Sequence, residues 1–314
     1  MRRIGALLIV FFSWVTPALS QNVLTVNGLK CENKVNPTGI ENKHPRLSWI
    51  LKSKERDQIQ SAYRIIVSDN SESLKLNIGN IWDSGKTISE NSIQVDYRGM
   101  PLQAGRKYFW KVKVWNRDDV ASDWSNDATF CTGLYTPSDW SNAHWIGYER
   151  LRDSMLLVPG IHGSGNNAGK LALQRPVVPM FRKDFLVNRK VANAQLFISG
   201  LGQYEAYLNG RRIDNRFLAP GWTDYDKTVL YNAYDVTDQI ISGKNSIGVI
   251  VGNGFHNINR ERYRKLVITF GMPRMISKLK IVYTDGTEES MVSGADWKCA
   301  PSPVTFTSIY GGED

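Results

Sequence analysis

Hydrophobic and polar residues alternate with a period of two along most of the chain, which is the spacing of β-strands rather than of helices. Residues 62–68 and 107–115 show this alternation most clearly. In the first segment, Tyr63, Ile65 and Val67 share one face. In the second, lysines separate a row of apolar side chains, which are Tyr108, Trp110, Val112 and Val114. Each segment therefore predicts a strand with one buried and one solvated face.

Shorter apolar runs between turn residues predict more strands in the same half of the chain. They cover residues 47–51, 80–83, 93–95 and 128–132. A spacing of about ten residues per strand is typical of an antiparallel sandwich. Trp49 lies in an early strand, and Tyr108 follows Leu102 at the entry to the long strand, which resembles the tyrosine corner of fibronectin type III domains. We expect residues 22–134 to form a fibronectin type III-like sandwich that serves as a spacer or packing module.

The strand pattern is interrupted near Pro137 and then returns. The predicted strands of this second half cover residues 181–187, 194–199, 204–208, 228–234, 246–251, 275–283 and 289–292. Asn209-Gly210 and Asp285-Gly286 predict two-residue hairpin turns, because both pairs tolerate positive φ. Only residues 237–241 indicate a short helix. The fold class is therefore all-β, and residues 136–314 are predicted to form a second sandwich of the jelly-roll type.

The first 20 residues have a different pattern. Arg2 and Arg3 precede an apolar run that ends at Val15, and the small residues Ala18 and Ser20 suit a signal peptidase. The run is too short to cross a bilayer comfortably. We expect a signal peptide over residues 1–20 and a mature chain without a membrane span, exported to the periplasm or the extracellular space.

Composition narrows the class of protein. The chain has 314 residues, of which 42% are hydrophobic, and this content excludes a disordered chain. Three cysteines exclude a disulfide scaffold, although Cys31 and Cys131 could meet if the first and last strands of their sandwich are neighbours. The net charge of +9 is scattered among apolar strands, so we expect a solvated surface and no nucleic-acid partner. Abundant aromatic residues suit short strands and ring-lined sugar clefts.

Few motifs indicate chemistry. Gly169-Lys170 is not a phosphate-binding loop, because Ser164 replaces the leading glycine and Leu171 replaces the metal-binding hydroxyl. The histidines share no spacing typical of a metal site or a catalytic triad, and we expect isolated structural or surface roles for all of them. They are His44, His144, His162 and His256.

A family resemblance rests on several motifs in order. Residues 200–210, Gly-Leu-Gly-Gln-Tyr-Glu-Ala-Tyr-Leu-Asn-Gly, and residues 220–225, Pro-Gly-Trp-Thr-Asp-Tyr, resemble the N-terminal module of bacterial α-L-rhamnosidases. Further stretches that fit this module are residues 234–237, 252–255 and 309–313. The fibronectin-like domain that precedes the module in this family is resembled by residues 45–49, 82–85 and 130–134.

The resemblance implies a role in handling rhamnose-containing carbohydrate. In that family, an acidic pair on a C-terminal toroid of α-helical hairpins performs inverting hydrolysis of terminal L-rhamnose, and we find no counterpart of this toroid in the sequence. Inversion needs two carboxyl groups about 6.5–9.5 Å apart, and nothing distinguishes any pair here. We therefore expect the non-catalytic, carbohydrate-recognising part of an α-L-rhamnosidase. Two alternatives stay open: a full α-L-rhamnosidase whose sequence is shortened, and a secreted adhesion or scaffolding protein.

The resemblance also implies that the second domain binds rhamnose through a calcium ion. The best matching ligand positions are Asp214, Asn215 and Asn253. Calcium prefers a carboxylate with neutral oxygen donors, and sugar hydroxyls could complete its six to eight ligands. Alternatively, Asp214 and Asn215 simply form a turn, and Asn253 accommodates the backbone between two glycines. Trp222 is either a stacking ring for the sugar or a loop anchor packed onto the sheet.

A basic cluster lies in the second half of the chain. It surrounds Tyr263 and consists of Arg260, Arg262, Arg264 and Lys265. This cluster is a candidate contact for galacturonate in rhamnogalacturonan, whose chain alternates galacturonate with rhamnose. The alternative is a solvated loop.

Overall fold

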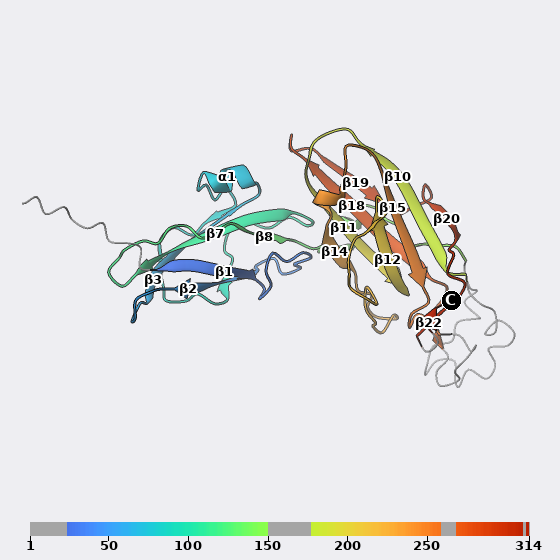
Figure 1. Cartoon of the computed structure of the whole chain (residues 1–314), viewed down its shortest axis with the longest axis horizontal. Helices are drawn as coiled ribbons and strands as arrows, with labels where there is room; N and C mark the ends of the chain where they lie inside the picture. The colour runs from blue at the N-terminus through green and yellow to red at the C-terminus, as the bar shows by residue number, and fades with distance from the viewer. Residues whose placement is uncertain (1–23, 150–176, 259–267, 310–311, 314) are drawn as a thin grey trace, which may run out of the picture.

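The structure, a computed structural model, describes residues 24–149, 177–258, 268–309 and 312–313. Two β-sandwiches lie end to end along the long axis of the molecule (Figure 1), which confirms the predicted all-β class. The expected signal peptide, the basic cluster at residues 260–265 and His162 lie outside the described residues. Among the helices that the structure describes, none has the length and hydrophobicity needed to span a membrane.

The first sandwich packs a small sheet against a larger one, and all strand pairs are antiparallel. The small sheet has the order β1 (Thr25–Cys31), β2 (Arg46–Lys52), β6 (Val95–Asp96). The larger sheet has the order β4 (Trp82–Asp83), β3 (Gln60–Ser68), β7 (Lys107–Asn116), β8 (Ala128–Cys131), with β5 (Thr87–Ile88) also paired to β3. A short helix, α1 (Ser71–Lys75), follows β3 and is capped by the Asn70 side chain, which accepts a hydrogen bond from the backbone nitrogen of Ser73 at 2.8 Å.

The core of the first sandwich contains the aromatic residues that the alternation singled out. Trp49 and Trp110 are buried, and the indole nitrogen of Trp49 donates a 2.9 Å hydrogen bond to the side-chain oxygen of Gln60. The hydroxyl of Tyr108 accepts a 2.9 Å hydrogen bond from the backbone nitrogen of Gln103. This bond forms the tyrosine corner that the sequence predicts.

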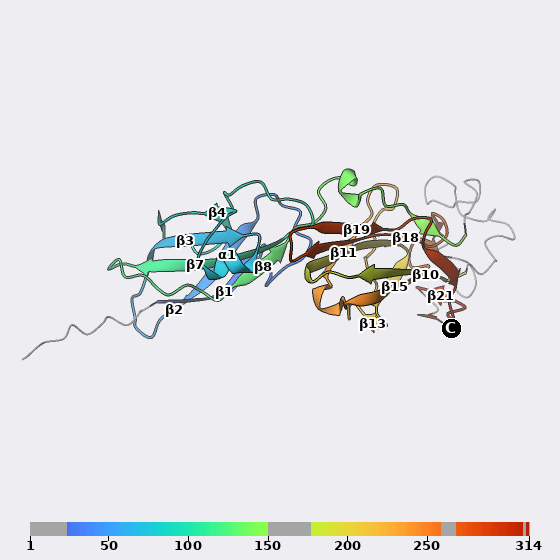
Figure 2. The same ribbon diagram turned by 90° about the horizontal axis from the view of Figure 1, so that it is seen from above.

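The second sandwich consists of two antiparallel sheets, which Figure 2 shows as separate layers. One sheet has the order β13 (Arg211–Arg212), β12 (Gln203–Leu208), β15 (Gly243–Gly252), β10 (Pro179–Val187), β20 (Lys298–Pro301). The other has the order β14 (Asn232–Asp235), β11 (Val191–Leu201), β18 (Arg274–Tyr283), β19 (Glu288–Val292), and β9 (Ile146–Gly147) pairs with β18.

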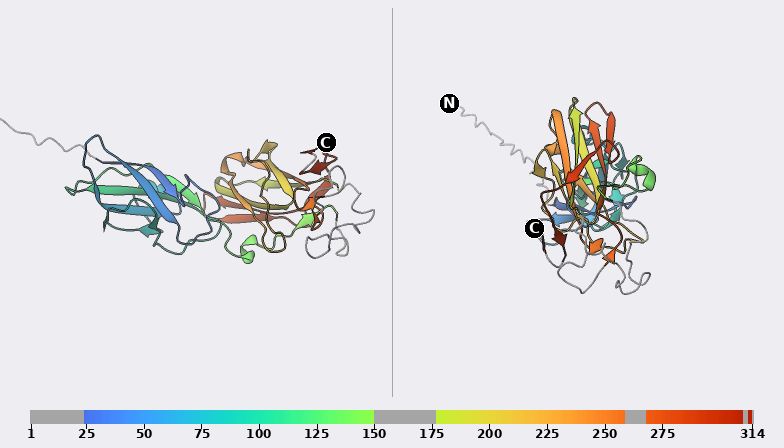
Figure 3. Two further views of the ribbon diagram at one scale, coloured as in Figure 1. Left: turned by 90° about the horizontal axis from the view of Figure 1, so that it is seen from below. Right: turned by 90° about the vertical axis from the view of Figure 1, so that its right-hand side faces the viewer.

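Two small hairpins complete this domain. They are β16 (Asn257–Ile258) with β17 (Ile268–Thr269), and β21 (Thr307–Ser308) with β22 (Gly312–Glu313). The second hairpin lies with the C-terminus at the end farther from the first sandwich (Figure 3). Among the residues that the structure describes, two short 3₁₀ helices, Pro137–Trp140 and Thr237–Gln239, lie in connecting segments. The second of them lies within the helix of about one turn that the sequence predicts at residues 237–241.

Two local features differ from the sequence prediction, and one turn agrees with it. Strand β1 was expected only as a first strand near Cys31, without bounds, because Gly28 at φ +60° produces a bulge that breaks the alternation between Asn27 and Lys30. Asn209-Gly210 forms the predicted two-residue turn, with φ of +52° and +77°. The turn between β18 and β19 is longer than predicted. Tyr283 donates its backbone N–H to the carbonyl of Thr287 at 2.9 Å, which leaves three residues in the loop.

The two sandwiches share a buried joint. Phe197 of β11 is fully buried in a cluster with Leu134 and Ala233, and Tyr231 packs against it. The hydroxyl of Tyr231 accepts a 2.9 Å hydrogen bond from the backbone nitrogen of Leu134, and an ion pair joins Lys107 Nζ to Asp235 Oδ2 at 2.8 Å. Apolar and polar contacts therefore both cross the boundary between the two domains.

Two of the three cysteines are buried, and the third is exposed. Cys31 and Cys131 are unpaired, and burial raises the pKa of each thiol to about 12. The possible bond between them is therefore not formed in the structure. Cys299 lies on strand β20 and is exposed.

Candidate functional site

The loop between β13 and β14 carries an unusual amount of exposed apolar surface. Phe217, Leu218 and Trp222 are 79%, 65% and 61% exposed. A 2.9 Å hydrogen bond from the backbone nitrogen of Tyr204 to the carbonyl of Ala219 fastens the middle of this loop to strand β12. Contiguous exposed apolar side chains on a soluble domain are typical of a binding surface.

Trp222 lies flat on a second aromatic ring within this surface. Its ring and that of Phe255 are stacked, with centroids 4.4 Å apart and an interplanar angle of 15°. One face of the indole is covered by Phe255, yet most of the residue stays exposed. The structure therefore places Trp222 at the surface rather than in the core as a loop anchor. Phe255 was missed in the sequence, although it belongs to the Gly-Asn-Gly-Phe motif.

Asp214 forms a local turn with Arg216. Its carboxylate accepts hydrogen bonds from the backbone nitrogen of Arg216 at 3.1 Å and from the guanidinium of the same residue. Partial burial acts to raise the pKa of Asp214, but the hydrogen bonds from Arg216 outweigh it and the pKa lies below its usual value. Asn215, the neighbouring candidate, is exposed.

A small cavity of about 10 Å³ lies beside Asp214 and is also lined by Glu205. This volume accommodates about one water molecule. Glu205 pairs with Arg212 at 2.7 Å between Oε1 and the guanidinium, and Asp214 pairs with Arg216. No glycosidic bond fits into such a space, and a carboxylate held by arginine does not retain the proton that a general acid needs. These two acids do not form a hydrolytic pair.

Asn253 is buried and fully engaged at the end of β15. Its amide nitrogen donates to the carbonyl and the hydroxyl of Thr307 at 3.1 and 3.0 Å. Its amide oxygen accepts a 3.0 Å hydrogen bond from the side chain of Asn257. Asn253 thus connects β15 to the C-terminal hairpin. This is a structural role, as in the alternative to metal binding given for it above.

The predicted calcium ligands do not fit a common site in this structure. Asp214 is neutralised by Arg216, whereas the oxygen of Asn253 is occupied by Asn257, and neither of the two cavities described in this section brings Asp214 and Asn253 together. In the described ranges, no group of three or more His, Cys, Asp or Glu residues is arranged to hold a metal ion. Calcium binding stays a prediction, and these contacts argue against it.

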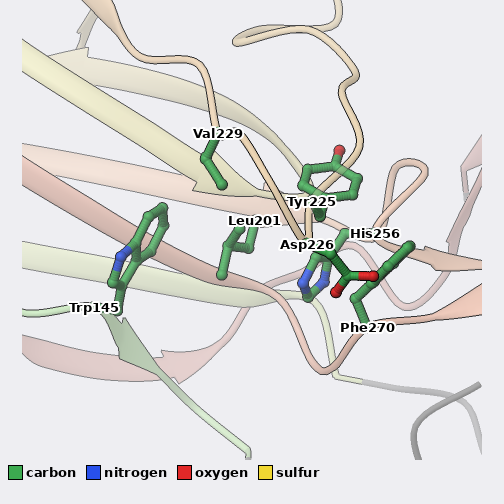
Figure 4. Close-up of a pocket in the computed structure, with 7 residues that line it drawn as sticks. All are labelled: Trp145, Leu201, Tyr225, Asp226, Val229, His256 and Phe270. Atoms are coloured by element: carbon green, nitrogen blue, oxygen red, sulfur yellow. The ribbon is translucent and has the colours of Figure 1, made fainter. Parts of the chain in front are cut away.

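A larger cavity of about 230 Å³ opens near the exposed loop, and no sequence motif predicted it. Figure 4 shows Tyr225, His256 and Phe270 grouped at one end of it and Trp145 at the other, with Leu201 and Val229 between them. Asp226 is the remaining lining residue. The ring of Tyr225 meets His256 edge-on at 5.2 Å between centroids, and Phe270 lies 6.0 Å from the same imidazole.

His256 is a buried, neutral base. It is 3% exposed, and burial together with the nearby positive charge of Arg274 lowers the pKa of its imidazole to about 4. A hydrogen bond with the backbone of Gly271 acts in the opposite direction. The Nδ1 atom of His256 is buried without a hydrogen-bond partner. We expected an isolated structural or surface role for His256. The structure buries it in the lining of a cavity, among aromatic rings. His44 and His144, by contrast, are exposed.

Comparison with known proteins gives the family. Residues 26–136 match the Rha78A-like N-terminal immunoglobulin domain, and residues 189–314 match the α-L-rhamnosidase N-terminal domain. The immunoglobulin sandwich shares its architecture with the fibronectin type III domain expected for the first half.

Relatives match over almost the whole chain but over only part of their own length. The α-L-rhamnosidase of Formosa agariphila is 35% identical over 312 residues, which are 98% of this chain and 33% of that protein. The solved α-L-rhamnosidase from Dictyoglumus thermophilum has a TM-score of 0.72 and 39% identity, covering 92% of this chain and 31% of that one. The enzyme from Aspergillus terreus gives a TM-score of 0.71 and 29% identity, with 92% and 31% covered.

The chain thus spans about a third of the length of the first of these curated relatives. Both of its sandwiches lie within matched regions, and both contain motifs on which the resemblance rests. The chain thus matches α-L-rhamnosidases over their N-terminal region, and each of its two sandwiches matches one of their N-terminal domains.

Proposed function

We propose that the second domain binds carbohydrate and serves as the recognition part of an α-L-rhamnosidase that acts on rhamnose-containing glycosides. The observation that carries this proposal is the exposed ring of Trp222, held flat by Phe255. A fixed planar ring offers a platform for the C–H face of a sugar, since aromatic side chains combine a large apolar face with little conformational freedom.

The size of the ring makes the contact energetically useful. A sugar that covers about 100 Å² of the indole gains about 2.5 kcal/mol from apolar burial, at about 25 cal/mol per Å². Stacking on Phe255 fixes the ring before the sugar arrives, so that little entropy is lost on binding. The neighbouring cavity of about 230 Å³ supplies additional aromatic surface.

Rhamnose-containing carbohydrate is the partner most consistent with these features. The relatives named above are α-L-rhamnosidases, and rhamnose combines hydroxyls with an apolar methyl group that suits an aromatic surface. Contact with rhamnogalacturonan through the basic cluster at residues 260–265 and export by the N-terminal 20 residues are further parts of this proposal. Exposed charges are screened within about 10 Å at 0.1 M salt, so binding that uses the cluster weakens as salt is added.

Titration of the purified chain with L-rhamnose and rhamnose-terminated oligosaccharides in a calorimeter tests the proposal. We expect saturable binding that weakens at least tenfold in Trp222→Ala, because the stacking platform is lost. Phe217→Ala is the matched control, since Phe217 lies in the same loop, is 79% exposed and has its ring beside Arg212. Absence of binding in the unmodified chain would refute the proposal and favour an adhesion or scaffolding role.

Two further arms separate the remaining alternatives. If the described Asp214 and Asn253 contacts persist in solution, a calcium chelator leaves sugar affinity unchanged. Loss of binding with chelator and with Asp214→Ala would instead establish the calcium site expected from the resemblance. Turnover of an aryl α-L-rhamnoside that scales with protein concentration would assign hydrolysis to these domains themselves.

A further inference from the structure

We propose that the cavity lined by Trp145, Tyr225, His256 and Phe270 binds a single neutral deoxy-sugar ring, which donates a hydroxyl hydrogen bond to Nδ1 of His256. This inference rests on the proposed function and deepens it, because it locates the recognised unit. It also assigns a role to a residue that the sequence left without one.

The dimensions of the cavity set the size of its ligand. Its volume is about 230 Å³, which is below the range of about 300–1,000 Å³ found for drug-sized ligands and well above that of an ordered water molecule. One six-membered ring with its substituents therefore suits the space. Longer chains have to leave through the mouth of the cavity.

The walls define the chemistry of the ligand. Aromatic and aliphatic side chains form most of the lining, and Asp226 is the only charged side chain among the lining residues that the structure describes. Among these described residues, a uronic acid, a phosphate or a nucleotide meets a carboxylate and no lysine or arginine, although the positive charge of Arg274 acts on His256 from nearby. The lining instead favours an uncharged molecule with C–H faces or a methyl group, and a deoxy sugar has both.

His256 provides the polar contact. Buried polar atoms are almost always hydrogen-bonded, yet its Nδ1 is buried without a partner. The imidazole also bonds to the backbone of Gly271, and this bond falls to the other ring nitrogen because Nδ1 has none. A carbonyl accepts, so that nitrogen carries the proton and Nδ1 is left as an acceptor. A hydroxyl of the sugar supplies the missing donor.

The cavity and the stacking platform come from the same two segments of the chain. Trp222 and Tyr225 lie on one loop, and Phe255 precedes His256 directly. In each segment, one residue belongs to the exposed stack and a close neighbour belongs to the cavity. A terminal ring in the cavity thus continues toward Trp222, where the next unit of an oligosaccharide stacks.

Calorimetric titration of the full chain with L-rhamnose, and separately with L-mannose, tests the assignment. The two sugars differ only in the 6-hydroxyl, so we expect L-rhamnose to bind at least tenfold more tightly. His256→Phe retains an aromatic ring without the acceptor, and we expect a loss of at least tenfold. His256→Asn places an amide atom near the position of Nδ1 and restores part of the affinity, which a purely structural role would not do.

A second variant keeps the test independent of His256. Val229→Phe narrows the cavity from the loop side and leaves the imidazole in place, and we expect it to abolish binding of the monosaccharide while the melting temperature stays near that of the parent chain. If L-rhamnose binds and Trp222→Ala weakens it, but the His256 and Val229 variants bind like the parent, the cavity assignment is wrong and the proposed function survives. If neither the monosaccharide nor rhamnose-terminated oligosaccharides bind, both fail.

Discussion

At the scale of single residues, His256 is a buried group whose chemistry departs clearly from that of the free amino acid. Burial and the charge of Arg274 lower its pKa to about 4, so it stays neutral in the folded protein at pH values where an unfolded chain is already protonated. Because only the unfolded imidazole takes up a proton in this pH range, protonation stabilises the unfolded state. The free energy of unfolding therefore falls on the acidic side of neutrality.

The free energy of unfolding should therefore depend on pH through this residue. The unfolded imidazole takes up a proton below about pH 6.5 and the folded one only near pH 4, so stability falls as the pH drops between these values, by up to about 3 kcal/mol. Urea denaturation at pH 7 and pH 4.5 measures the fall. In His256→Asn, which has no titrating group at this position, the difference between the two pH values should shrink. An equal pH dependence in both proteins would contradict the assignment.

Side-chain partners explain why the candidate site was only partly predictable. Trp222 was singled out from the sequence, and the structure leaves its ring exposed. Whether Asp214 is available to a ligand depends on Arg216 in the same turn. For Asn253 it depends on the nearby Asn257 and on Thr307 of the distant C-terminal hairpin. No spacing rule connects Asn253 to Thr307. The cavity around His256 likewise joins residues whose separation in sequence carries no signal.

At the scale of the elements, alternation identified the long strands well, since a half-buried strand imposes a period of two on its sequence. It failed where an element has another cause. Strand β1 contains a glycine bulge, β20 is a short edge strand, and α1 depends on the cap at Asn70. The turn between β11 and β12 depends on Gly202, whose φ is +120°.

Substitution of Gly202 should be far more costly than substitution of another turn glycine. A Cβ atom at Gly202 would lie 2.1 Å from the carbonyl oxygen of Gly252, so backbone strain and a steric clash act together. Gly210 also has positive φ, but no atom lies within 4 Å of its added Cβ. We expect Gly210→Ala to cost about 1 kcal/mol and Gly202→Ala at least about 3 kcal/mol, as measured by chemical denaturation. Equal losses would show that the clash is relieved by a shift of β15.

At the scale of the whole molecule, the joint between the sandwiches decides whether they unfold as one. Phe197 is fully buried there, although it belongs to the second domain and its ring lies 3.3 Å from the position of a Cβ on Gly105 of the first. A sequence pattern predicts that such a residue is buried, but not that another domain covers it. This is why two sandwiches were foreseeable and their shared core was not.

Removing the ring should uncouple the two domains. Phe197→Ala leaves a cavity in the joint, and we expect a loss of about 3 kcal/mol with separation of one calorimetric unfolding transition into two. Phe185→Ala, which packs against the core of the second sandwich rather than the joint, should lower stability without that separation. A parent chain that already unfolds in two steps would contradict the coupling.

The exposed position of Cys299 has a practical consequence. The other two thiols of the chain are buried and have a pKa of about 12, so a maleimide reagent reacts at a single position without any engineering. Strand β20 belongs to the sheet that also contains β12 and β15. A fluorophore attached there labels this domain, and the proposed sugar binding can be followed with it at the single-molecule level.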